Sequence, residues 1–123
     1  MKLTNLEMFN YLNALDNISD KVYGKLGYAV ARNLRKITNE LIEFEDMRLK
    51  IFYKYATLNK DNEYELQPNT ESYQKFINEI NEIAMISHKV DIYKIEPDLV
   101  IESNLSAKEL NDLIFMIKDE EVK

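Results

Sequence analysis

Apolar side chains recur in alternating steps of four and three along a stretch of the chain that contains no proline. The repeat begins at Val30 and continues to Tyr55, and the next proline is Pro68. A repeat of this kind buries one face of a helix against a partner. The predicted helix, from near residue 21 to near residue 56, would be about 50 Å long at about 1.5 Å per residue. Its buried seam consists of Val30, Leu34, Ile37, Leu41, Phe44, Arg48, Ile51 and Tyr55, among which Arg48 is the one charged member.

Two capping boxes mark the beginnings of shorter helices at either end of the chain. Thr4 is followed three residues later by Glu7, and Ser106 is followed three residues later by Glu109. In such a box the hydroxyl and the carboxylate each accept a hydrogen bond from the other residue's backbone N–H. We therefore expect a helix that begins near Thr4 and ends at residues 16–17, and a last helix that begins near Ser106. The first is expected to bury Leu6, Phe9, Leu12 and Leu15, and the last Leu110, Leu113, Ile114 and Ile117.

The middle of the chain predicts a helical hairpin. Ser19 or Asp20 is the expected N-cap of the long helix, and Asn69 or Thr70 is the expected N-cap of a second helix antiparallel to its far half. Between the two helices, residues 60–63 have turn composition, which predicts a loop or a small β-hairpin. The apolar stripe of the second helix consists of Tyr73, Phe76, Ile77, Ile80, Ile83 and Ala84.

Short strands are expected after the second helix, because apolar and polar residues alternate over residues 90–95 and a β-branched run follows at residues 99–101. The fold class predicted is mainly α: a long helical hairpin packed with N- and C-terminal helices and a small antiparallel β element. An α+β fold with a larger sheet is the alternative. The 123 residues suit one domain, residues 1–123. Since the seam is longer than one shorter helix can cover, we expect a homo-oligomer.

Composition limits the chemistry and the location. The chain has no cysteine, two glycines and two prolines. These numbers exclude disulfides and cysteine-ligated metals and favour helix. The sequence predicts no transmembrane helix and no secretory signal, so we expect a cytoplasmic protein.

Catalytic apparatus is not evident in the sequence. His88 is the single histidine, and no serine lies in a nucleophile-elbow motif. The pairs Glu40/Glu43 and Glu79/Glu82 place carboxylates one helical turn apart, but each pair lies among other charges, as on a solvated surface. We therefore predict no catalytic residue, no metal site and no cofactor.

Positive charge is concentrated in one segment. Residues 21–36 contain five Lys or Arg and no Asp or Glu, while the whole chain carries a net charge of −6. Helical spacing places these cations on one face, with Gly24 and Gly27 beside it as a possible close approach for a ligand or a backbone. This face is either a solvated surface paired with acidic residues or a site for an anionic nucleotide. Duplex nucleic acid is not expected, because the net charge is negative. The candidate anion-binding residues are Lys25, Tyr28, Arg32, Arg35 and Lys36.

Negative charge gathers around the predicted loop and second helix. It is either a solubilising surface or a docking surface for a basic protein partner, where complementary potentials accelerate association. The candidate partner-binding residues are Asp61, Glu63, Glu65, Glu79 and Glu82.

Several segments together carry a resemblance that covers nearly the whole chain. They are residues 2–5, 28–41, 48–56, the acidic turn, 76–83, 90–95 and 105–117. In these segments the chain resembles a family of short phage and prophage proteins of unassigned function from Gram-positive hosts. The resemblance implies a phage-encoded protein that acts in the host cytoplasm or in the virion, and it brings no active-site residues with it.

Three functions are open at this point. The first is a non-enzymatic inhibitor of a host-defence system, similar to an anti-CRISPR protein, that docks on a host protein. The second is an oligomeric sponge that sequesters an anionic nucleotide signal. The third is a structural protein of the phage tail or of its assembly.

Overall fold

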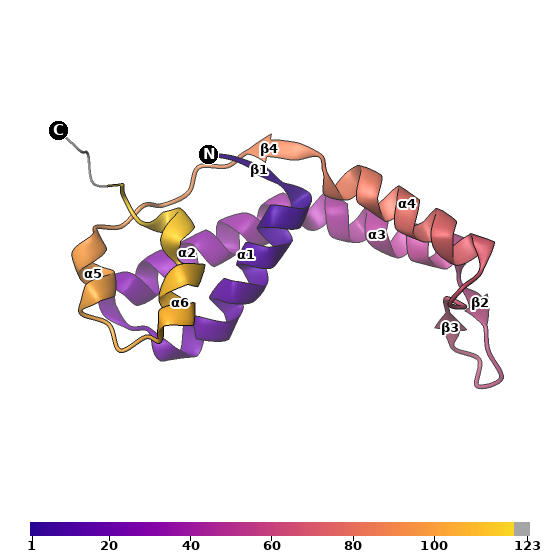
Figure 1. Ribbon diagram of the computed structural model, residues 1–123, viewed down its shortest axis with the longest axis horizontal. Helices are drawn as coiled ribbons and strands as arrows, with labels where there is room; N and C mark the ends of the chain where they lie inside the picture. The colour runs from indigo at the N-terminus through magenta and orange to yellow at the C-terminus, as the bar shows by residue number, and fades with distance from the viewer. Residues whose placement is uncertain (120–123) are drawn as a thin grey trace.

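The computed structural model describes residues 1–119, which form a helical base and a projecting two-helix arm (Figure 1). The mainly α class with a small antiparallel β element is confirmed. The base contains α1 (Asn5–Ile18), α2 (Gly24–Glu40), α5 (Pro97–Ile101) and α6 (Ala107–Asp112). The arm consists of α3 (Ile42–Tyr55) and α4 (Glu71–Ala84). Short 3₁₀ turns, η1 (Ser19–Lys21) and η2 (Ile114–Met116), follow α1 and α6.

Both capping boxes are confirmed. At the start of α1, Glu7 N donates to Thr4 Oγ1 over 3.0 Å, and Thr4 N donates to Glu7 Oε1 over 2.9 Å. The corresponding distances at the start of α6 are 3.2 and 3.0 Å. Thr70 is the N-cap of α4, as one of the two predicted alternatives. The predicted cap of the long helix is wrong: η1 occupies residues 19–21, and α2 begins at Gly24.

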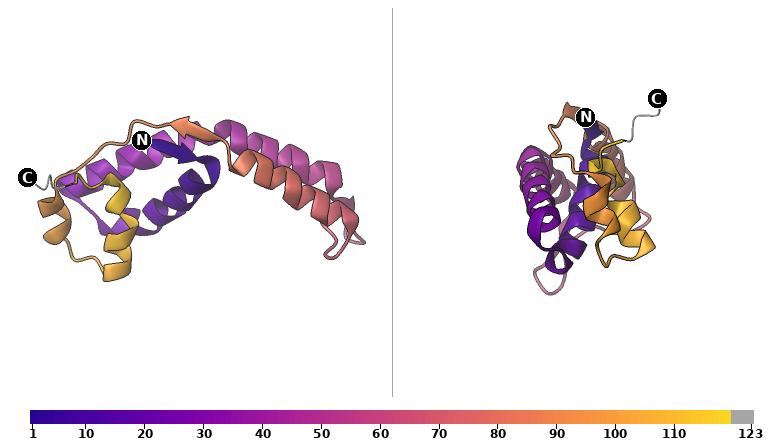
Figure 2. Two further views of the ribbon diagram at one scale, coloured as in Figure 1. Left: turned by 45° about the horizontal axis from the view of Figure 1, so that its top comes forward. Right: turned by 90° about the vertical axis from the view of Figure 1, so that its left-hand side faces the viewer.

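The long helix is bent at Leu41, so the prediction of one continuous helix is wrong at this residue. The Leu41 N–H is shared between the carbonyls of Ile37 and Thr38, at 3.1 and 3.3 Å. One turn earlier, Thr38 Oγ1 donates to the Leu34 carbonyl over 2.7 Å, a back-bond that bends helices. The chain then continues as α3 in a new direction (Figure 2).

The seam itself is confirmed across the bend, because all of its members face inward. Leu34, Arg48 and Tyr55 are half-buried and the other five are buried. The guanidinium of Arg48 lies over the ring of Phe9, 5.1 Å from its centroid, which gives this charge an aromatic neighbour.

The arm is the predicted helical hairpin. α3 and α4 pack side by side along their length (Figure 1), and β2 (Thr57–Leu58) pairs antiparallel with β3 (Tyr64–Glu65) at the far end. Asn59 builds the turn between these strands, since its Oδ1 accepts from the backbone N–H groups of Asp61 and Glu63 at 2.8 and 3.0 Å. The small-hairpin alternative is therefore confirmed.

The strands expected at residues 90–95 and 99–101 are wrong. The actual strand, β4 (Ser87–Lys89), comes earlier and pairs antiparallel with β1 (Lys2–Thr4). The predicted alternation is correct, since Val90, Ile92 and Ile95 are buried. However, the backbone of this segment bonds to Met1 at Val90, to the Asn33 side chain at Tyr93 and, through an isolated parallel bridge, to Ile117 at Ile95. Residues 97–101 form α5 instead, with Pro97 in its first turn, where proline favours a helix.

The first and last helices differ in detail from the prediction. α1 continues past residues 16–17 to Ile18. α6 ends at Asp112, and the change to 3₁₀ geometry exposes Ile114, at 61 %, while Phe115 and Met116 are buried. The ring of Phe115 stacks on Tyr11 with centroids 3.9 Å apart, which joins the end of the chain to α1. Leu6, predicted to be buried, is exposed.

Candidate functional sites

The predicted anion-binding residues lie together on α2, on the outside of the base. A hollow of about 510 Å³ is lined by Tyr28, Ala31, Arg32, Arg35, Lys36 and Asn39. A second hollow, of about 620 Å³, shares Tyr28 with the first and also contains Lys25. The five candidates therefore contribute to two adjoining depressions.

Two of the predicted cations already have partners within the fold. Lys36 donates to the Asp91 backbone carbonyl, and its Nζ lies 3.3 Å from the Asp91 carboxylate. Arg32 donates to the Tyr28 hydroxyl over 3.2 Å, and its guanidinium lies over the ring of Tyr93 at 5.0 Å. Within residues 1–119, the side chain of Arg35 forms no hydrogen bond or ion pair.

The second hollow is also lined by residues from outside α2, which the sequence pattern did not group with this helix. Tyr93, Lys94 and Lys118 come from the C-terminal part of the chain and line it together with Lys25 and Tyr28. Glu96 also lines this hollow, and its carboxylate lies 2.7 Å from Lys118 Nζ, which raises the pKa of Lys118 above its ordinary value. No local motif indicated this grouping, because only the fold brings the segments together.

The two glycines beside the basic face have different roles. A Cβ on Gly27 would lie 2.8 Å from the Val22 carbonyl oxygen, so the chain's own backbone occupies the close approach there. Gly24 has a φ of +62°, which glycine adopts without strain, and a Cβ there would meet nothing within 4 Å. Of the two glycines, Gly24 is therefore the one with open space beside it for a ligand.

The predicted acidic residues are spread along the arm rather than gathered at one end. Asp61, Glu63 and Glu65 lie on the hairpin at the far end, whereas Glu82 lies near the end of α4, where the arm meets the base (Figure 1). Glu79 accepts hydrogen bonds from Lys54 and Tyr55, each at 2.7 Å, and these bonds lower the pKa of Glu79. Glu79 therefore joins α4 to α3.

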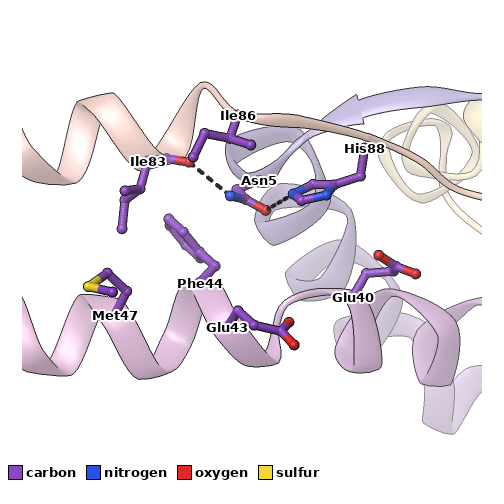
Figure 3. Close-up of a pocket in the computed structure, with 8 residues that line it drawn as sticks. All are labelled: Asn5, Glu40, Glu43, Phe44, Met47, Ile83, Ile86 and His88. Carbon is purple, nitrogen blue, oxygen red and sulfur yellow. Dashed lines mark hydrogen bonds between the residues drawn. The ribbon is translucent and has the colours of Figure 1, made fainter.

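A third hollow, of about 440 Å³, lies at the root of the arm (Figure 3). Phe44, Met47, Ile83 and Ile86 form its apolar wall, and the carboxylates of Glu40 and Glu43 lie on one side of it. This arrangement suits an apolar group that carries a positive charge. No local motif indicates this site, because its residues come from distant segments. The lining residues are Asn5, Glu40, Glu43, Phe44, Met47, Ile83, Ile86 and His88.

The Asn5 amide holds this root together. Its Nδ2 donates to the Ile83 carbonyl over 2.8 Å, and its Oδ1 lies 3.1 Å from His88 Nε2 (Figure 3). Because the carbonyl requires a donor, the amide oxygen faces the imidazole, and His88 Nε2 must carry a proton. His88 is half-buried and lies in β4.

Further tests for particular classes of protein give few indications. No helix among residues 1–119 has the length and apolar composition to cross a bilayer, and the same residues contain no cluster of three potential metal ligands. Comparisons with protein-family models, curated proteins and solved structures find no match.

Proposed function

We propose that this chain is a non-enzymatic binding protein that docks on a protein partner through the tip of its arm. The arm tip is defined here as residues 57–65, the β2–β3 hairpin with its turn. The main support for this proposal is that exposed apolar side chains lie at the arm tip beside carboxylates that have no hydrogen-bond donor within residues 1–119. Leu58 and Tyr64 are 57 % and 50 % exposed. The carboxylates of Asp61 and Glu63 accept no hydrogen bond from residues 1–119.

This combination is typical of a protein-binding surface. A tyrosine contributes a large contact area at low entropic cost, and aromatic residues are enriched among the residues that contribute most of the binding free energy of an interface. Carboxylates at the edge accelerate the approach of a basic partner and select against acidic ones. The projection of the tip away from the base leaves it accessible to a large partner (Figure 2).

We propose further that the partner is a bacterial defence protein that the chain inhibits in the host cytoplasm. The small size, the net charge of −6 and the resemblance to phage proteins support this choice. A role in tail structure or assembly uses the same tip on a phage protein, so the identity of the captured partner distinguishes the two.

The test compares charge reversal at the tip with an equal reversal on the base. Asp61→Lys/Glu63→Lys changes the tip, and Asp16→Lys/Glu102→Lys changes two exposed carboxylates of the base. Immobilised parent and base variant should capture the same protein from a lysate of a Gram-positive host, and the tip variant should lose it. With the purified partner, the tip variant should associate more slowly and with a flatter dependence on salt. Equal capture by all three proteins would contradict docking through the tip.

Binding of an anionic nucleotide to the base is a second candidate function. The adjoining hollows that share Tyr28 support it, since they place Lys25 and Arg35 beside aromatic rings. Arg32→Ala should cost about 1.5–3 kcal/mol of ligand binding. Protein incubated with lysate from cells with active nucleotide-signalling defences should release a nucleotide on denaturation, detectable by mass spectrometry. If no nucleotide is released and calorimetry against cyclic nucleotides gives no heat, the basic face is a solvated surface.

A further inference from the structure

A second apolar stripe follows the side of α3 that faces away from α4. It consists of Ile42, Leu49 and Tyr53, which are 51 %, 57 % and 55 % exposed, and we call it the outer stripe. At about 100° per residue, Leu49 and Tyr53 each lie within about 20° of Ile42 around the helix, opposite Phe44 and Ile51 of the buried seam. α4 lies along the other side of α3 (Figure 2, left).

The outer stripe continues onto the arm tip. The rings of Tyr53 and Tyr64 meet edge to face, with centroids 5.1 Å apart and planes at 90°. With Asp46 as its one interruption, the apolar surface therefore extends from the start of α3 to the β2–β3 hairpin. Contiguous exposed apolar surface of this kind is uncommon on a protein that works as a monomer and marks a surface for association.

Charges beside the outer stripe indicate which partner fits. Glu43 lies beside the beginning of the stripe, and Lys50 lies on the same side nearer its end. Both side chains are exposed, and neither forms an ion pair with any residue that the structure describes. A second α3 that runs in the opposite direction would bring its lysine to this glutamate and its glutamate to this lysine. A parallel copy would carry the partner's Glu43 and Lys50 to the opposite edge of the interface, where they could not pair with these two residues.

We propose that a second copy of this chain docks antiparallel on the outer stripe. Ile42 then faces the partner's Tyr53, Leu49 faces the partner's Asp46, and Glu43 pairs with the partner's Lys50, each contact occurring twice by symmetry. The two bases lie at opposite ends of this dimer, so their basic faces remain separate. The proposal does not depend on docking at the arm tip or on nucleotide binding.

Asp46 is the one polar residue within the stripe. A polar side chain at a core position of paired helices fixes the register and weakens the association. Asp46→Leu should therefore tighten the dimer about tenfold or more, corresponding to about 1.4 kcal/mol per factor of ten. Tighter dimerisation of Asp46→Leu would show that the outer stripe forms the interface, because removal of an exposed charge elsewhere would not strengthen self-association through α3.

The first experiment is sedimentation velocity over a wide concentration range. The parent should convert from monomer to dimer as its concentration rises. Leu49→Glu should remain monomeric, whereas Ile101→Glu, the same kind of change at an exposed residue of α5, should dimerise like the parent. A parent that stays monomeric throughout, or a Leu49→Glu variant that still dimerises, would overturn the proposal.

The second experiment tests the relative direction of the two α3 helices. It changes residues beside the outer stripe, so no charge has to be introduced into the stripe itself. Glu43→Lys and Lys50→Glu should each weaken the dimer about tenfold, because each places like charges together at both ends. The double variant Glu43→Lys/Lys50→Glu should restore the parent affinity. Circular dichroism checks that each variant keeps its helix content. A double variant as weak as the single ones would exclude the antiparallel pairing.

Discussion

Asn33 determines how the C-terminal half of the chain attaches to α2. Its side chain is fully buried, and its amide forms two hydrogen bonds with the backbone of Tyr93: Nδ2 donates to the carbonyl over 2.9 Å, and Oδ1 accepts from the N–H at 2.8 Å. One side chain thus takes the place of a neighbouring strand. This contact explains why an alternating segment at residues 90–95 is extended without belonging to a sheet.

Replacement of Asn33 should be costly in stability. Asn33→Ala leaves two backbone groups of Tyr93 without partners, at about 1–3 kcal/mol for each buried group. We expect the free energy of unfolding to fall by at least about 2 kcal/mol in urea titrations. Asn13→Ala, at an exposed position of α1, is the matched control and should change stability little. Equal stability of the two variants would show that Asn33 does not hold this segment.

Glu109 predicts a pH dependence of stability. Lys21 Nζ lies 2.8 Å from its carboxylate, and this contact, with the Ser106 N–H, lowers the pKa of Glu109 from 4.5 to about 2. The folded protein therefore binds this proton less readily than the unfolded chain. The stabilisation is present above about pH 4.5 and is lost as the pH falls toward 2. Glu79, whose pKa is also lowered, acts in the same direction.

The variant Glu109→Gln isolates this contribution, because glutamine keeps the capping box and removes the charge. Its melting temperature should fall less steeply than that of the parent between pH 4.5 and 2. Glu102→Gln, at an exposed glutamate, should follow the parent curve. If Glu109→Gln also followed the parent curve, the ion pair with Lys21 would not contribute to the stability.

At the level of elements, the sequence predicted what depends on nearby residues. The capping boxes at Thr4 and Ser106 and the turn at Asn59 are local, and each is present. The bend at Leu41 could not be predicted from the seam, since the apolar spacing continues through it unchanged. The prediction of a strand at residues 90–95 is wrong because this segment is held by Asn33, a residue far away in the sequence.

The same distinction holds for the candidate sites. Lys25, Tyr28 and Arg32 were identified because they share one helix face. Tyr93 and Lys118 could not be identified with them, because only the tertiary fold brings these residues to α2. The sequence groups the glutamates of α4 with those of the acidic turn. Because α4 runs from the tip of the arm back toward the base, however, Glu82 lies at the root of the arm.

The two faces of the bent helix should respond differently to mutation. Leu41 is buried in the seam and Leu49 lies in the outer stripe. Leu41→Ala should therefore cost about 2–5 kcal/mol, and Phe44→Ala a similar amount. Leu49→Ala should leave the melting temperature of dilute protein nearly unchanged. Melting of the Leu41 and Phe44 variants within a degree of the parent would show that the seam is misplaced.

At the scale of the whole molecule, the base and the arm are stabilised by different contacts. The core residues of α1, α2, α5 and the segment 113–116 after α6 hold the base together, whereas α3 and α4 mainly contact each other beyond the root. Two helices cannot bury all of their apolar residues, so the arm retains exposed ones such as Met47, Leu49 and Tyr53. The arm therefore provides both proposed association surfaces, the tip and the outer stripe.

Small-angle X-ray scattering tests this central claim most directly. A compact protein of this length would have a radius of gyration of about 14 Å. Dilute Leu49→Glu protein, in which self-association is suppressed, should give a clearly larger radius of gyration and a distance distribution with an extended tail, because the arm projects from the base. A radius of gyration of about 14 Å with a symmetric distance distribution would contradict the projecting arm and, with it, the accessibility of both surfaces.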